Sequence, residues 1–264
     1  MNTAFWVSDN TNIRQLVNSA WQMEGTPSYS HETILPKGVI ELIFSFSEAP
    51  AFSHSSLNEK ADTPRCFING MNSTPLYLKT PAHQFFFGIE LNPLAVKKLL
   101  AVPPGMFLNS VTDLTLISKD FDSLWHQLAE AVTFQQRVTI IYQWAGKKQS
   151  AFSEQELAFS SYLHDTSPAG AVTGLASRFC YSVRQLSRRS NDLFGMSTES
   201  LIGYKRYLHS VRWLHHSKET LTSVGYECGF YDQAHFIREF RDYTGITPGD
   251  YRRQKSDMPA HLFG

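Results

Sequence analysis

The sequence predicts an α+β protein with a β-rich front part and an all-α back part. Short apolar runs separated by Pro, Gly and Asn fill the first third of the chain. From residue 152 onward, apolar residues recur at helical spacing, with capping residues at the expected helix ends. The length of 264 residues suits two parts that each bury a core.

The front part carries four segments that predict strands, since each is dense in aromatic, β-branched or leucine residues: 41–46, 67–71, 75–79 and 83–91. Asn69-Gly70 inside the second segment is a turn signal. Short strands spaced by turn residues are typical of a small β-barrel or a sandwich, and both remain open.

Helical spacing follows the strands. Residues 94–100 predict a short helix that Pro103-Pro104-Gly105 would stop, and 120–142 predict one or two helices. The polar stretch 146–150 is the expected linker. The predicted domains are therefore 1–145, a regulatory domain, and 152–255, a second domain.

The back part contains two helix-turn-helix units. In the first, a short helix with an apolar face precedes a helix capped by Ser182 and ended by Gly195. We expect this second helix to bury Val183, Leu186 and Leu193. Its two outward arginines, Arg184 and Arg188, suit guanine recognition because guanidinium can donate two hydrogen bonds to one base.

The second unit follows the same plan. A short helix is followed by Gly229-Phe230 at the turn and by Asp232 as a cap. The next helix would bury Phe236, Ile237 and Phe240 and leave its other face exposed, namely Gln233, Ala234, His235, Arg238 and Arg241. Between the units, residues 198–217 predict a helix of roughly 30 Å. Major-groove faces of DNA recur every ~34 Å, so one chain could place two helices in successive major-groove segments.

Net charge is zero, from 24 basic and 24 acidic residues, which argues against a strongly basic nucleic-acid binder. However, residues 182–213 hold six basic and two acidic residues, a local stripe that could engage phosphates. The sequence predicts a cytoplasmic protein, because it has no apolar leader and no apolar stretch of membrane-spanning length. The three cysteines are scattered and lack metal-type spacing, so we expect no metal site and no cofactor.

Residues 152–253 resemble the DNA-binding domain of AraC-family transcription regulators. The resemblance rests on Leu175-Ala176, Ser182-Val183-Arg184-Gln185-Leu186, Phe194-Gly195, Gly229-Phe230, Asp232-Gln233, His235-Phe236, Arg238-Glu239-Phe240, Gly245-Ile246-Thr247-Pro248 and Tyr251-Arg252. It implies base contacts by Arg184, Ser187, Arg188, Gln233, His235 and Arg238. Three residues depart from the pattern: Ser190 where a large apolar residue is usual, Cys180 where glycine is frequent, and His215 where leucine is common.

The front part is similar to a sensor domain of unassigned ligand, through LPKGVIELIF, ING and FFFGIELNPLAV. Aromatic walls with a few polar groups are typical of a small-molecule site. We expect the effector site among Trp21, Tyr29, Phe44, Phe46, Phe86 and Glu90. Glu41 and Glu90 lie in apolar runs, so each should face solvent or have a partner, which a ligand could supply.

These observations predict a sequence-specific transcription regulator that is not an enzyme. Its expected partner is double-stranded DNA. A small-molecule effector, self-association as a homodimer and contact with RNA polymerase remain open. Two other classes are less favoured by the sequence. One is an enzyme with a metal or methyl-acceptor site, because the histidines are isolated and the front half has a single cysteine. The other is an interaction module that has lost DNA binding.

Overall fold

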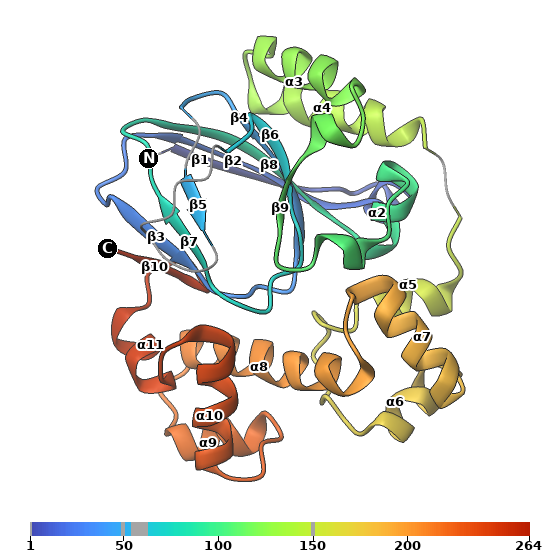
Figure 1. The fold of residues 1–264 in the computed structure, drawn as a ribbon, viewed down its shortest axis with the longest axis vertical. Helices are drawn as coiled ribbons and strands as arrows, with labels where there is room; N and C mark the ends of the chain where they lie inside the picture. The colour runs from blue at the N-terminus through green and yellow to red at the C-terminus, as the bar shows by residue number, and fades with distance from the viewer. Residues whose placement is uncertain (1, 49–50, 54–62, 149–150) are drawn as a thin grey trace.

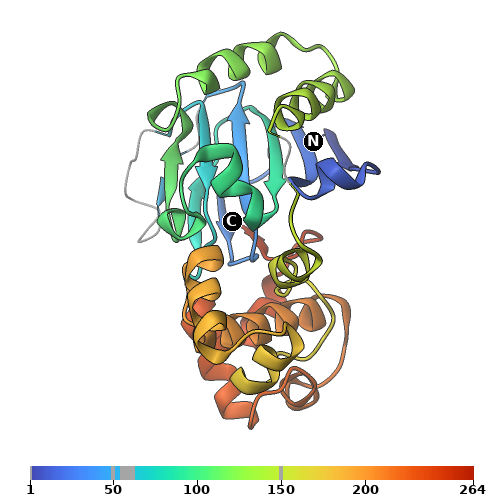
Figure 2. The same cartoon turned by 90° about the vertical axis from the view of Figure 1, so that its right-hand side faces the viewer.

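The computed structural model describes residues 2–48, 51–53, 63–148 and 151–264, and it divides into a β-rich half and a helical half (Figures 1 and 2). The β-rich half holds two antiparallel sheets. The six-stranded sheet has the order β1 (Asn2–Val7), β2 (Val17–Gly25), β8 (Gln84–Leu91), β4 (Ile40–Ser45), β6 (Cys66–Asn69), β9 (Val111–Asp113). The four-stranded sheet has the order β10 (His261–Phe263), β3 (His31–Ile34), β7 (Leu76–Lys79), β5 (Ala51–Ser53).

The two sheets face each other as a sandwich. One apolar cluster lies between them and includes Phe67 and Phe86 from the larger sheet and Leu78 from the smaller one. Strands β1 and β9 are the edges of the first sheet, and β10 and β5 those of the second. In the described residues no ladder joins these edges, so the sandwich alternative is confirmed and the barrel alternative is wrong.

The four predicted strands are confirmed as β4, β6, β7 and β8, but the Asn-Gly turn is not a hairpin. Asn69 ends β6, whose sheet neighbours are β4 and β9. A Cβ on Gly70 would lie 1.6 Å from the carbonyl oxygen of Phe107. Glycine is therefore needed for close backbone approach rather than for a tight turn between adjacent strands.

The predicted front helices are present. Helix α2 (Pro93–Leu100) is followed by the 3₁₀ turn η1 (Pro104–Phe107) at the Pro-Pro-Gly stop. A short helix that the sequence did not predict, α1 (Thr11–Arg14), precedes β2. After η2 (Leu114–Leu116), the 120–142 region forms two helices, α3 (Asp120–Glu130) and α4 (Phe134–Gly146). They lie at the end of the sandwich farthest from the helical half (Figure 1). Of the expected linker, Gly146 ends α4, and residues 149–150 lie outside the described residues.

The helical half contains seven helices in the described residues: α5 (Glu154–Ser160), α6 (Val172–Arg178), α7 (Val183–Phe194), α8 (Thr198–His216), α9 (Leu221–Glu227), α10 (Gln233–Thr244) and α11 (Pro248–Gln254). The long helix α8 runs beneath the sandwich, with α6 and α7 at one end and α9 and α10 at the other (Figure 1). Its predicted span is confirmed.

The chain returns to the sandwich after α11. Strand β10 pairs antiparallel with β3, and Phe263 stacks on Tyr29 with ring centroids 4.1 Å apart. His261 Nδ1 lies 2.5 Å from Glu32 Oε1; Glu32 is buried, and the His261 side chain is 11% exposed. Figure 1 shows this strand beside β3. The C-terminal segment thus links the second helix-turn-helix unit to the edge of the smaller sheet.

Further contacts join the halves. The fully buried Tyr204 hydroxyl of α8 donates to the Asn72 carbonyl (2.6 Å) and accepts from the Gly38 amide (2.9 Å). Elsewhere between the halves, η1 meets the end of α7 so closely that a Cβ on Gly105 would lie 2.9 Å from the Cα of Gly195. The two halves therefore share one continuous core.

The Gly105→Ala substitution tests this close contact. Because the added methyl meets backbone rather than a flexible side chain, we expect the free energy of unfolding to fall by about 1–3 kcal/mol. Gly174→Ala is the matched control, since Gly174 lies exposed in α6 with no atom within 4 Å of the added Cβ. Alanine should there add about 0.5–1 kcal/mol. Urea unfolding measures both, and equal effects of the two substitutions would contradict the packing described.

Candidate nucleic-acid interface

The first helix-turn-helix unit is α6, a turn and α7. Ser182 caps α7, because its hydroxyl accepts from the Gln185 amide (3.2 Å) while the Gln185 side chain accepts from the Ser182 amide (2.9 Å). The predicted cap is thus confirmed, as is the ending at Gly195, whose φ is +68°. The expected burial of Val183 is wrong: it is 49% exposed. Val183 is the first residue of α7, and the buried face begins one turn later at Leu186.

The turn of this unit holds a cysteine in left-handed backbone. Cys180 has φ +52° and corresponds to Gly229 (φ +82°) in the second unit. The correspondence follows from matching hydrogen bonds, from the Tyr181 amide to the Ala176 carbonyl (2.9 Å) and from Phe230 to Gly225 (3.0 Å). A Cβ in this region costs roughly 1–2 kcal/mol. The first turn therefore has a local strain that the second avoids.

Ser190 is fully buried at the position where the second unit has Phe240, also fully buried. The Ser190 hydroxyl lies 3.4 Å from that of Thr198 at the start of α8. Phe240 instead packs against the rings of Tyr207, Phe236 and Tyr251. Helix α7 thus has less internal packing than α10, and it is supported from outside by η1 of the sandwich.

The second unit is α9, a turn and α10. Asp232 caps α10 by accepting from the His235 amide (2.7 Å), which confirms the predicted cap. Phe236 and Phe240 are fully buried as expected, whereas Ile237 is only half-buried. Gly245 ends the helix with φ +72°.

The residues expected to contact bases lie on α7 and α10. Arg184 and Arg188 are exposed on α7, with Ser187 half-buried beside them. Gln233 and Arg238 are exposed on α10, and the Gln233 side chain accepts from the Thr222 hydroxyl (2.6 Å). His235 differs: it is 29% exposed, and its Nε2 lies 3.0 Å from Glu239.

Most basic side chains of the stripe 182–213 pair with other groups of the protein. Arg189 pairs with Glu156, Lys205 with Asp165 and Arg206 with Glu239. Arg212 donates to the carbonyls of Leu163 and His164. Within the described parts of the chain, Arg184 and Arg188 are the stripe residues that are exposed without an ion pair. The exposed arginines of this stripe that have no ion pair therefore both lie on α7.

The residues expected at an effector site do not gather in one place. Trp21 and Phe86 belong to the cluster between the sheets. Glu90 shares their face by strand alternation, because Trp21 covers Gly88. Phe44 faces the opposite cluster, and Tyr29 stacks on the C-terminal strand. The sixth residue, Phe46, packs on Trp125 of α3.

The two strand carboxylates have partners in the protein. Glu41 accepts from the Trp21 indole (3.1 Å) and the Lys37 ammonium (3.1 Å). Burial raises the pKa of Glu41, but Lys37 together with His261 and the Trp21 indole outweighs burial and holds that pKa below its usual range. Glu90 accepts from Asn18 (2.9 Å). The charges in these strands are thus accounted for without a ligand.

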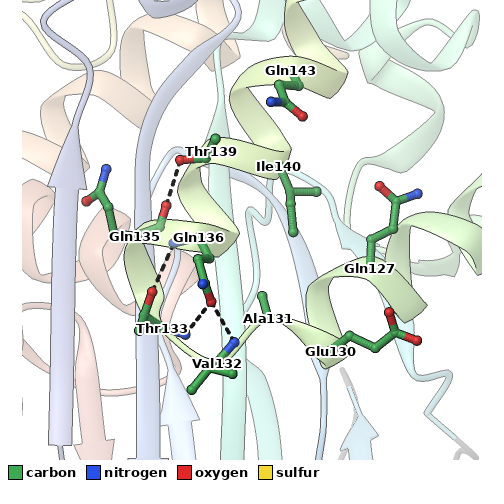
Figure 3. Close-up of a pocket in the computed structure, with 10 residues that line it drawn as sticks. All are labelled: Gln127, Glu130, Ala131, Val132, Thr133, Gln135, Gln136, Thr139, Ile140 and Gln143. Carbon is green, nitrogen blue, oxygen red and sulfur yellow. Dashed lines mark hydrogen bonds between the residues drawn. The ribbon is translucent and has the colours of Figure 1, made fainter.

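A hollow of about 610 Å³ lies instead between α3 and α4 (Figure 3). Its lining is rich in glutamine and contains none of the residues expected at the effector site: Gln127, Glu130, Ala131, Val132, Thr133, Gln135, Gln136, Thr139, Ile140 and Gln143. No group of metal-ligating side chains is found among the described residues. No helix in the described ranges is long and apolar enough to cross a membrane.

The two turns allow a direct comparison of glycine with a side chain in left-handed backbone. We expect Cys180→Gly to leave the free energy of unfolding unchanged or to raise it by up to about 1 kcal/mol, because relief of strain offsets the added chain entropy. Gly229→Ala should lower it by about 1–2 kcal/mol. Urea unfolding of both variants measures this, and clear destabilisation by Cys180→Gly would show that the thiol stabilises the turn.

Comparison with known proteins agrees with this geometry. Residues 175–254 match a family described as a helix-turn-helix domain, and residues 10–113 match a domain of unknown function (DUF6597). The chain is 32% identical over 84 residues to the HTH-type transcriptional activator RhaS of Citrobacter koseri, which covers 32% of this chain and 30% of that protein. It is also 32% identical over 81 residues to RhaS of Pectobacterium atrosepticum, covering 31% and 29%.

Among solved structures, ToxT from Vibrio cholerae O395 aligns over 89% of this chain and 97% of its own, with 9% identity and a TM-score of 0.45. The matches to the RhaS proteins span less than a third of their length. The family match assigns residues 175–254 to an AraC-type helix-turn-helix domain, whereas residues 10–113 match a domain family of unknown function.

Proposed function

We propose that the protein is a transcription regulator that inserts α7 and α10 into successive major-groove segments of duplex DNA. The observation that carries this is the paired arrangement: two capped helices with exposed Arg or Gln residues, joined by one continuous helix. Helix α8 has 19 residues, so it spans about 28 Å. This length suits two readers on groove faces ~34 Å apart.

Readout would divide between the helices. Arg184 and Arg188 suit guanine, because a guanidinium donates two hydrogen bonds to its paired acceptors. Gln233 suits adenine, and Arg238 a further guanine or a phosphate. Ser187 stands beside the arginines as a smaller donor. The relatives' name, transcriptional activator, supports a role at promoters, where RNA polymerase would be a partner.

The sandwich would be the regulatory domain, at about 1–145, and the helical half the DNA-binding domain, at about 152–255. The protein would be cytoplasmic and would act by binding rather than by catalysis. The contacts of the sandwich with α8, with α7 and through β10 support the regulatory role, because a change in the sandwich would alter both helix-turn-helix units. A small effector or a second copy could supply the change, provided that it prefers one arrangement over another. Trp21, Phe86 and Glu90 share the inner face on which an effector would bind.

The full chain should enrich a two-part site from a pool of random duplexes. We expect Arg188→Ala and Arg238→Ala each to relax a different half of that site, by about 1–3 kcal/mol, since each removes a direct reader. Arg14→Ala is the matched control, because Arg14 is exposed on α1 of the sandwich. Affinity by fluorescence anisotropy against each half-site measures the effect.

Enrichment of only the half read through Arg238 would make α7 a positioning element. No enrichment even at low salt, where phosphate contacts are strongest, would contradict the proposed function and favour an interaction module without DNA binding.

A further inference from the structure

A chain of polar contacts runs from the linker helix to the turn before the second recognition helix. Arg206 of α8 donates to both carboxylate oxygens of Glu239 on α10, at 3.2 Å each. Oε2 of that carboxylate, which Arg206 also contacts, lies 3.0 Å from His235 Nε2. His235 Nδ1 accepts from the Tyr231 amide at 3.3 Å. Three side chains thus connect α8 to the backbone of Tyr231.

The surface of α8 leaves room for the Glu239 side chain in this series of contacts. Glu239 approaches α8 beside Gly203, where a Cβ would lie 2.7 Å from Glu239 Oε1. Glu239 is 15% exposed and Arg206 is 24% exposed, so both groups are partly withdrawn from water. Charge-assisted hydrogen bonds in such places are stronger than those at a fully solvated surface.

Both ring nitrogens of His235 already have partners in the protein, so neither is free to bond to a DNA base. Because Nδ1 accepts the Tyr231 amide, the proton lies on Nε2, which faces Glu239. Its ring also packs edge-on against Phe230, with centroids 5.6 Å apart. Reading a base edge requires a donor or acceptor that points into the groove. His235 would have to break two contacts to supply one.

Tyr231 differs from His235 because its side chain is exposed. Its amide is held by His235, and its side chain is 91% exposed, the largest value among the exposed large hydrophobic residues of the described ranges. It directly precedes the cap Asp232 and stands two residues before the exposed Gln233. A phenol beside the recognition helix can donate its O–H to a phosphate oxygen that borders the groove.

We propose that Tyr231 is a further DNA-contacting residue, which donates to a backbone phosphate, and that His235 is a positioning residue held by Glu239 and Arg206. This rests on the proposed DNA binding and refines its second half-site. Base readout there then falls to Gln233 and Arg238, and the linker helix fixes the depth at which α10 meets the groove.

The test is DNA affinity of full-length variants for the selected duplex and for a scrambled duplex. Tyr231→Phe removes only the hydroxyl of an exposed side chain, so folding should be intact. We expect about tenfold weaker binding to both duplexes, because a phosphate contact carries no sequence information. Tyr142→Phe is the matched control, since Tyr142 is an exposed tyrosine on α4 of the sandwich.

His235→Ala should weaken binding to both duplexes alike, without relaxing preference at any base pair. In the His235→Ala background, Tyr231→Phe should cost clearly less than tenfold, because the phenol is no longer held in place. Glu239→Gln, which removes the charge while retaining the shape, should act in the same direction as His235→Ala. Thermal unfolding of each variant separates these effects from loss of folding.

Equal affinity of Tyr231→Phe and wild type would overturn the phosphate contact. Relaxed preference at one base pair in His235→Ala would make that histidine a reader and overturn its positioning role. If the wild-type chain binds no duplex, the proposed function fails and this inference fails with it. If the wild type binds and only the Tyr231 and His235 results disagree, the proposed function stands.

Discussion

Two buried tyrosine hydroxyls on helix α8 hold the molecule together. Tyr204 and Tyr207 are fully buried, and a hydroxyl without a partner is costly in an apolar interior. Their partners come from the sandwich: Tyr204 bonds to Gly38 and Asn72, and Tyr207 donates to the Pro36 carbonyl (3.1 Å). The helix that joins the two helix-turn-helix units is therefore also the helix on which the sandwich rests.

The remaining contacts reinforce this arrangement at its two ends. At one end, η1 supports α7, whose own packing is reduced at Ser190. At the other end, β10 carries the chain from α11 back to β3. On the far side of α8, Tyr207 stacks on Tyr243 of α10 at 4.6 Å. A shift of the sandwich loops would consequently move both α7 and α10.

Local signals in the sequence predicted much of the helical half. Ser182 and Asp232 cap their helices, and Gly195 and Gly245 end them, because capping depends on a few neighbouring residues. Cys180 was recognisable as a departure from glycine, and its φ of +52° gives the reason that glycine is frequent there. These features follow from local backbone geometry, which a single sequence carries.

Long-range pairing could not be predicted in the same way. Strand β10 is three residues long and pairs with a strand more than two hundred positions earlier, so no local pattern marks it. The effector-site prediction grouped Phe44 with Phe86, but the pairing register, unknown from sequence, sends them to opposite faces. The outward position of His235 on the helix was predictable, whereas its capture by Glu239 depends on Arg206, which lies on another helix.

Native-state hydrogen exchange of the full chain tests most directly whether α8 joins the halves into one unit. The tyrosine contacts predict that amides of α8 and β3 open with free energies equal within about 1 kcal/mol in the wild type, as one cooperative unit does. In the double variant Tyr204→Phe/Tyr207→Phe, α8 should open at clearly lower free energy while β3 keeps its protection. Independent opening of α8 and β3 in the wild type, or an unchanged double variant, would contradict the central role of these two hydroxyls.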